Sequence, residues 1–173
     1  MRFSILTLLI VTTICAVGTM SWNSSRPPSV AEWGFTVPPD GNHNMDEGCV
    51  YEHFYGKSWQ EALGLLKEND EYYVEDFSYM PKPAFNFYYP VLVKHVTSNP
   101  LGERNVIGYL GLVAHKIEFD SNLLDRHANM TIDTIRFIEA HATDYDELDG
   151  PYHLFENRLR ECVESEWFLK NGG

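Results

Sequence analysis

The chain has few basic residues and few cysteines for its length. It contains 13 Lys and Arg against 25 Asp and Glu, which gives a formal net charge of -12, and only three Cys. Such an acidic field repels nucleic acids and anionic lipid surfaces. After residue 18, the chain also lacks any apolar run long enough to cross a bilayer. The composition therefore disfavours nucleic-acid and membrane partners and fits a basic protein or a polar ligand better.

The first eighteen residues have the pattern of a secretory signal peptide. Arg2 gives a weakly positive start, residues 5–17 are mostly apolar, and Ala16 and Gly18 place small residues where a signal peptidase cleaves. The alternative is an uncleaved anchor, because the run is only just shorter than the roughly 18 to 20 residues that span a bilayer. We expect residues 1–18 to be removed and the protein to be secreted or periplasmic.

Removal of this signal would leave two cysteines. Cys15 lies within it, so Cys49 and Cys162 remain, and two cysteines in an oxidising compartment usually pair. A bridge between them would contribute about 4 to 5 kcal/mol on the chain-entropy model, because it closes a long loop. A catalytic or metal-binding thiol is the alternative, and no other ligand lies at the required spacing. The sequence predicts a disulfide between Cys49 and Cys162.

The remaining chain divides into an arm and one domain. Residues 19–45 are rich in proline, which blocks helices and removes sheet donors, although Trp33 and Phe35 can anchor this segment on the domain surface. Residues 46–173 carry apolar residues at helical spacing. We predict a mainly α fold, a single-domain orthogonal helical bundle of roughly five to seven amphipathic helices with an extended N-terminal arm.

Several positions predict where the helices begin, bend and meet. Ser58 starts a capping-box pattern, and Asp70 and Thr131 are expected to cap later helices. Pro90 should kink or split the helix that begins near Pro83. The predicted last helix runs from residue 152 to about 169. Glycines at 108 and 111 are expected to let another helix approach closely.

Motifs of known chemistry are incomplete in this chain. A phosphate-binding loop ending at Gly56-Lys57-Ser58 needs a glycine where Tyr51 stands, so this triplet reads as a turn and a helix cap. The chain has no Gly-X-Ser-X-Gly elbow and no His-Glu-X-X-His pair. Residues 144–156 match a calcium loop only in part, since Tyr145 replaces its first aspartate. No cofactor or metal is predicted.

Two carboxylates and a histidine are the candidate catalytic residues. Glu75 and Asp76 lie beside tyrosines, as in a sugar-cleaving cleft, but adjacent helical residues point about 100° apart and cannot form one flanking pair. One of them could instead act with a histidine such as His53 or His95. The alternative without catalysis is that the two carboxylates lie on an exposed helix face. The aromatic run 85–89 is more typical of a core. Phe87 falls on the opposite side and, if exposed beside Tyr79, would contribute to a ligand or partner patch.

Several short segments of the chain form one recognisable block: His53-Phe54-Tyr55-Gly56-Lys57-Ser58, Glu61-Ala62, Glu75-Asp76-Phe77, Met80 and Ala84-Phe85-Asn86-Phe87-Tyr88-Tyr89-Pro90. This block resembles a family of small uncharacterised bacterial proteins over about 40 residues. The resemblance implies no activity, ligand or catalytic residue, but it favours a bacterial exported protein.

These observations favour a non-catalytic binding or interaction module with an acidic surface. The alternative function is a small secreted hydrolase that uses a carboxylate and a histidine in a cleft. Asn23 and Asn129 each begin a triplet that matches the N-glycosylation pattern, which applies only in a eukaryotic secretory pathway.

Overall fold

The computed structural model describes residues 26–34, 45–98, 103–142 and 152–172, and within these ranges it contains helices and no strand. This confirms the predicted mainly α, single-domain fold. The predicted signal peptide and most of the arm lie outside the described residues. The helices are α2 (Met45–Phe54), α3 (Trp59–Glu68), α4 (Asp70–Tyr79), α5 (Lys82–Ser98), α6 (Glu103–Phe119), α7 (Asn122–Asp125), α8 (Ala128–Ala140), α9 (Tyr152–Val163) and α10 (Glu166–Gly172).

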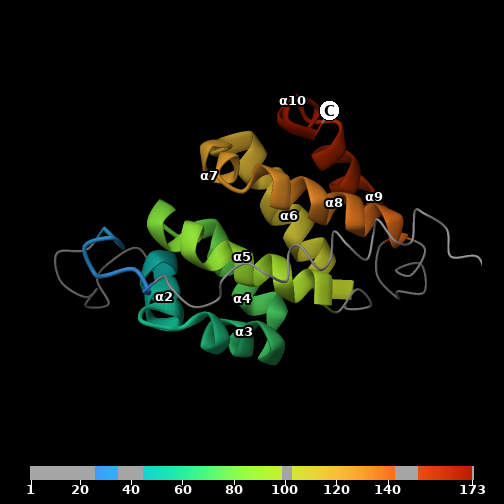
Figure 1. Cartoon of the computed structure of the whole chain (residues 1–173). Helices are drawn as coiled ribbons and strands as arrows, with labels where there is room; N and C mark the ends of the chain where they lie inside the picture. Colours follow the sequence, from blue (N-terminus) through green and yellow to red (C-terminus); the bar gives the residue numbers. More distant parts are fainter. Residues whose placement is uncertain (1–25, 35–44, 99–102, 143–151, 173) are drawn as a thin grey trace, which may run out of the picture.

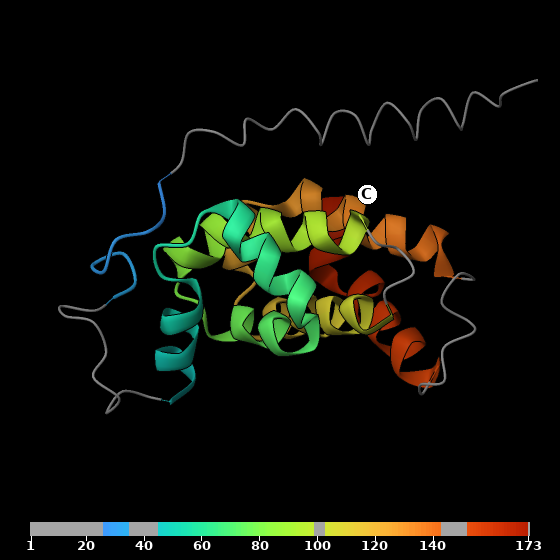
Figure 2. The ribbon, with the colours of Figure 1, turned by 90° about the horizontal axis from the view of Figure 1, so that it is seen from below.

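The longer helices form two layers. In one layer α5 packs between α3 and α8, and in the other α6 packs between α4 and α9. Figure 1 shows α5 running through the middle of the molecule, and Figure 2 shows the two layers one above the other, with α2 across one end. Within the described ranges, none of these helices has the length and apolar character that crossing a bilayer requires.

Helix α5 supplies much of the core. A helix that is apolar on nearly all sides is stable only when it is surrounded, and α5 is buried by helices of both layers. Its aromatic side chains were predicted to be core, and the structure confirms this for Phe85, Tyr88 and Tyr89, all fully buried. Both tyrosine hydroxyls have partners: that of Tyr88 donates to the Phe54 carbonyl, and that of Tyr89 lies 2.8 Å from the Tyr109 hydroxyl.

The helix starts agree only in part with the predicted caps. The capping box is confirmed, since the Ser58 hydroxyl accepts from the backbone N–H of Glu61 while the Glu61 carboxylate accepts from that of Ser58. The predicted cap at Asp70 is wrong by one residue, because the side chain of Asn69 caps α4. Thr131 is not a cap either. It lies buried inside α8, where its hydroxyl contacts a tyrosine of α5.

Two predicted helix boundaries also change. Helix α5 continues through Pro90 without splitting, although the proline removes the N–H that would normally bond to the Asn86 carbonyl. The predicted last helix is divided into α9 and α10. Ser165 explains the division, because its hydroxyl accepts from the backbone N–H of Phe168 and so caps a new helix start.

Helices α4 and α6 approach each other closely at a glycine, as predicted for Gly108. A β-carbon added there would lie 3.2 Å from Cγ1 of Val74, which is tighter than an ordinary contact. Further along the same pair of helices, the ammonium of buried Lys116 donates to the Ser78 carbonyl at 2.8 Å. A carbonyl in the last turn of α4, which has no partner within its own helix, is thereby satisfied.

The predicted disulfide is not formed. Cys49 is an exposed free thiol on α2, whereas Cys162 is a buried free thiol on α9 whose Sγ donates to the Leu110 carbonyl at 3.5 Å. Burial raises the pKa of Cys162 to about 12. Helix α2 packs on α4 and α9 packs on α6, so the helices that carry the two thiols lie at opposite ends of the molecule (Figure 2).

Candidate functional site

His53 and Asp76, two of the three candidate catalytic residues, are in direct contact. Nδ1 of His53 on α2 lies 2.8 Å from Oδ2 of Asp76 on α4. The rings of Tyr72 and Tyr73 pack edge-on against the imidazole, with centroids 5.2 and 5.3 Å away. The sequence separates the pair by 23 residues, and the packing of α2 on α4 brings them together.

The environment of this pair sets its chemistry. Asp76 is 7% exposed, and its burial raises the pKa of the carboxyl, while the hydrogen bond and charge of His53 act in the opposite direction. A carboxylate that accepts from Nδ1–H leaves Nε2 as the basic nitrogen of the ring. This arrangement can support general base chemistry. It can equally serve as a polar link between two packed helices.

The other candidate residues do not join this pair. Glu75 is exposed on α4, next to Asp76 in sequence but pointing to solvent. His95 is buried on α5, with Nε2 3.9 Å from a carboxylate oxygen of Asp70. Cys49 lies on α2 one helical turn before His53, and the described residues contain no group of three His, Cys, Asp or Glu side chains able to hold a metal ion.

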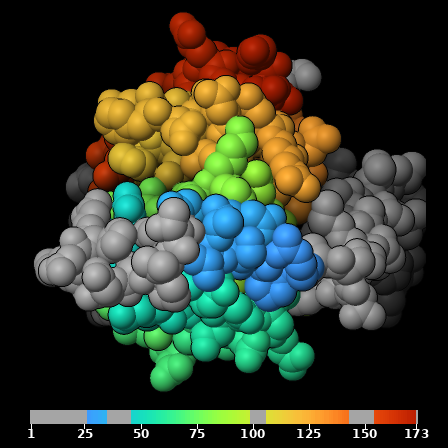
Figure 3. All heavy atoms as spheres, turned by 90° about the vertical axis from the view of Figure 1, so that its left-hand side faces the viewer, coloured from blue at the N-terminus to red at the C-terminus, as the bar shows by residue number. Residues whose placement is uncertain are grey.

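A groove of about 790 Å³ opens elsewhere on the surface, between the arm, α3, α5 and the start of α8. Figure 3 shows this side of the molecule, with the arm in blue beside α5 in green and α7 and α8 in gold to orange. A volume of this size is typical of small-molecule sites. Neither His53 nor Asp76 lines it.

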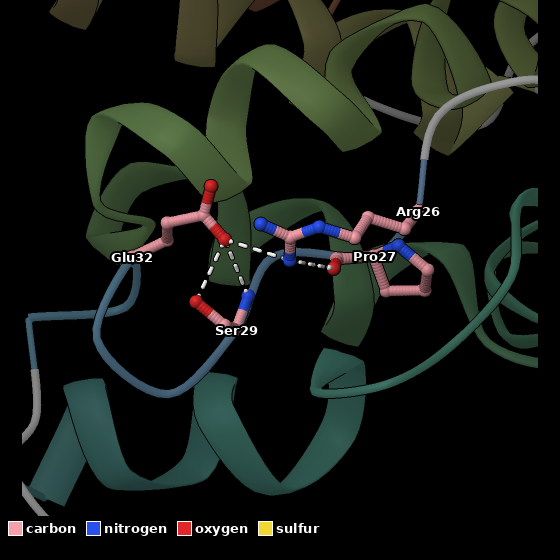
Figure 4. A network of polar contacts seen from close by, with 4 residues as sticks. All are labelled: Arg26, Pro27, Ser29 and Glu32. Atoms are coloured by element: carbon pink, nitrogen blue, oxygen red, sulfur yellow. Dashed lines mark hydrogen bonds and ion pairs between the residues drawn. The ribbon is translucent and has the colours of Figure 1, made fainter.

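The arm forms one wall of the groove because it is fixed to the domain. Trp33 is 3% exposed and packs edge-on against Tyr51 of α2, with the ring centroids 5.5 Å apart, which confirms its predicted anchoring role. Figure 4 shows how a polar network closes the arm on itself: one Glu32 oxygen accepts from the backbone N–H and hydroxyl of Ser29 and from the Arg26 guanidinium. These hydrogen bonds, with that from the Ser29 N–H largest, lower the pKa of Glu32.

Apolar side chains supply much of the lining. Phe87, which was expected on the far side of α5 from the other aromatics, is 9% exposed and packs against Trp59 of α3 with ring centroids 6.0 Å apart. The apolar residues that line the groove are Pro28, Trp59, Pro83, Phe87, Pro90 and Met130. Aromatic and proline rings offer flat, rigid surfaces, so ligand binding there costs little side-chain entropy.

The charged lining is basic, unlike the chain as a whole. Arg26, Lys82 and Arg126 line the groove together with a single carboxylate, that of Glu32. Arg26 is neutralised by Glu32, with 3.0 Å between the ion-pair atoms. Lys82 and Arg126 are exposed and have neither a hydrogen-bond nor an ion-pair partner among the described residues. Sequence reasoning missed both, because isolated basic residues form no motif.

The groove lining also includes an uncharged polar pair, His127 and Asn86. His127 is 8% exposed, and burial, helped by the charge of Arg126, lowers its pKa to about 4. The imidazole is therefore neutral at neutral pH. Its Nε2 lies 3.2 Å from Oδ1 of Asn86, and since an amide oxygen only accepts, Nε2 carries the proton. Both residues line the groove, to which they add polar atoms without charge.

Comparison with known proteins adds no assignment to this geometry. No protein-family model matches the chain, and neither the curated proteins nor the solved structures include a significant match.

Proposed function

We propose that this protein is a non-catalytic binding module whose ligand occupies the groove between the arm, α3, α5 and α8. The observation that carries the proposal is the groove itself, about 790 Å³ in volume, with Trp59 and Phe87 in its apolar lining and hydrogen-bonding groups beside them. Concave sites that combine apolar walls with a few polar groups are the usual places for small ligands. The ligand then has an apolar body and at least one polar group.

Contacts that hold two walls of the groove without a ligand support the proposal. Trp33 and the polar network hold the arm, and buried aromatic side chains hold α5. A preformed site binds without the cost of ordering its walls. The net negative charge of the whole chain has a separate, long-range effect, because it repels polyanions.

A titration with 4-phenylbutanol, a neutral probe with an aromatic body, tests the groove. We expect ¹H–¹⁵N NMR shifts at the Trp59 indole and at backbone amides around Phe87. Met130→Trp, which fills the groove from α8, should abolish these shifts. Glu139→Trp adds the same side chain at an exposed position of the same helix outside the groove and should preserve them. Shifts that survive Met130→Trp would reject this site.

A second candidate function is a small hydrolase centred on His53. The observation that favours it is the 2.8 Å contact with the buried Asp76 carboxyl, which fixes the imidazole orientation as general bases require. In this reading, Nε2 takes a proton from the attacking water. The pair does not line the groove, so this function is independent of the first proposal.

Hydrolysis of nitrophenyl esters and glycosides tests this second function. His53→Gln should remove any activity, Asp76→Asn should reduce it, and Glu75→Gln should leave it intact, because Glu75 is an exposed neighbour outside the pair. Equal rates for wild type and His53→Gln would rule out His53 as the base.

A further inference from the structure

We infer that the ligand of the groove is a small amphipathic anion, whose carboxylate or phosphate group lies near Lys82 and Arg126 and whose apolar body lies against Trp59 and Phe87. The inference rests on the proposed binding function and specifies the chemistry of its ligand. Lys82 and Arg126 both line the groove. Neither has a hydrogen-bond or ion-pair partner among the described residues.

The charges around the groove favour an anion over a neutral ligand. Arg26 and Glu32 cancel each other, which leaves two positive charges at a site within a chain of net charge -12. Unpaired cations at a concave apolar surface attract anions more strongly than in open water, because the low-dielectric walls screen the field less. Arg126 presents a planar fork suited to a carboxylate or phosphate, and Lys82 adds a point charge.

The positive end of a helix, the start of α8, also borders the groove. His127 is its N-cap residue and makes no side-chain cap hydrogen bond, while its Nε2 contacts Oδ1 of Asn86. The first backbone N–H bonded within this helix is that of Thr131, which donates to the His127 carbonyl. The N–H groups before it have no intrahelical partner, and the helix dipole there is positive. His127 and Met130 both line the groove, so this helix end borders the site.

The remaining polar lining fits this assignment. Asn86 and His127 are uncharged, so they neither compete with an anion nor neutralise the cations. The apolar lining, which includes Pro83 and Phe87, excludes water around the body of the ligand. A hydrated inorganic ion would leave this wall unused. An anionic group attached to an aromatic or aliphatic body uses both parts of the groove.

Four probes that share one body test the inference: 4-phenylbutyrate, 4-phenylbutyl phosphate, 4-phenylbutanol and 4-phenylbutylamine. Titration calorimetry and NMR on the full chain give their affinities. The two anions should bind at least about tenfold more tightly than the alcohol, as one or two charge-assisted hydrogen bonds provide. The amine should bind more weakly than the alcohol. Comparing the two anions shows whether a carboxylate or a phosphate is preferred.

Charge-removing variants locate the anion. Lys82→Gln and Arg126→Gln should each weaken the binding of 4-phenylbutyrate and 4-phenylbutyl phosphate about tenfold. The affinity for 4-phenylbutanol should stay unchanged. Lys67→Gln removes one positive charge from an exposed position of α3 outside the groove and should change neither. Circular dichroism should give the same helix content for all variants.

The outcomes separate the two proposals. Equal affinities for the alcohol and the anions, with Met130→Trp abolishing both, would overturn the anion inference and retain the binding groove. Tighter binding of the amine would also overturn it. If none of the four probes binds in the groove, both the inference and the binding function fall. If Lys67→Gln weakens anion binding as much as Lys82→Gln does, the effect reflects the overall charge of the chain. That result would reject the assignment of the anion to this site.

Discussion

The close approach of α4 and α6 at Gly108 can be tested against a matched glycine in the same helix. Replacing a glycine by alanine inside a helix normally stabilises it by about 1 kcal/mol, because alanine loses less backbone entropy. At Gly111 the nearest atom to an added β-carbon is Nε of Arg158, at an ordinary 3.9 Å. Gly111→Ala should therefore raise the free energy of unfolding by about 1 kcal/mol.

Gly108→Ala should have the opposite sign. Its β-carbon would lie 3.2 Å from Cγ1 and 3.7 Å from Cβ of Val74, a side chain that is 4% exposed. A buried β-branched side chain has few alternative rotamers, so it cannot turn away. Overpacking a core costs about 1 to 3 kcal/mol. Taking about 2 kcal/mol for this contact, we expect Gly108→Ala to be about 1 kcal/mol less stable than wild type and about 2 kcal/mol below Gly111→Ala.

Urea unfolding followed by circular dichroism measures both variants, with the dependence on denaturant unchanged. Combining Gly108→Ala with Val74→Ala provides a control, because the smaller side chain makes room for the added methyl group. The two changes together should then cost less than the sum of their separate effects. If Gly108→Ala stabilises the protein as much as Gly111→Ala does, the reasoning that Val74 blocks this position is refuted.

Three further predictions concern other parts of the chain. Ser58→Ala should lower the free energy of unfolding by about 1 kcal/mol, measured by urea titration, since it removes the cap of α3. Burial raises the pKa of Asp76 above its ordinary 3.8. The stability that this group contributes is therefore present below pH 3.8 and is lost as the pH rises through the raised pKa. Unfolding curves measured at each pH should show Asp76→Asn gaining stability relative to wild type as the pH rises through this range. Alkylation followed by peptide mass spectrometry should label Cys49 in the native protein and Cys162 only after denaturation, and a disulfide-linked peptide containing both would contradict the structure.

Local features of the fold were predictable where one short segment decides them. The capping box at Ser58 depends on backbone groups within three residues, and the sequence contains all of its parts. Thr131 shows where this reasoning fails. A threonine before an apolar run predicts a cap, but its hydroxyl instead contacts Tyr89, which is 42 residues away in the sequence. The cysteine prediction failed for a related reason, because compartment and cysteine number say nothing about distance between helices.

The candidate sites divide in the same way. His53 and Asp76 were chosen by residue type, and only the packing of α2 on α4 shows that they touch and that Glu75 stays outside. The sequence did not predict the groove. Phe87 was expected to join a ligand patch only if exposed, and it is buried, at 9% exposure. Lys82 and Arg126 belong to different helical segments and become neighbours of one groove through the packing of α5 and α8.

The sequence by itself determined that this chain forms amphipathic helices around an aromatic core, because helical periodicity is encoded over a few residues. It also determined an acidic net charge. Only the tertiary structure decided that basic residues gather at the groove, that the two thiols lie apart, and that Asp76 contacts His53. Those relations depend on distances between segments far apart in the chain, which are set by how side chains such as Val74 and Trp33 pack against other helices.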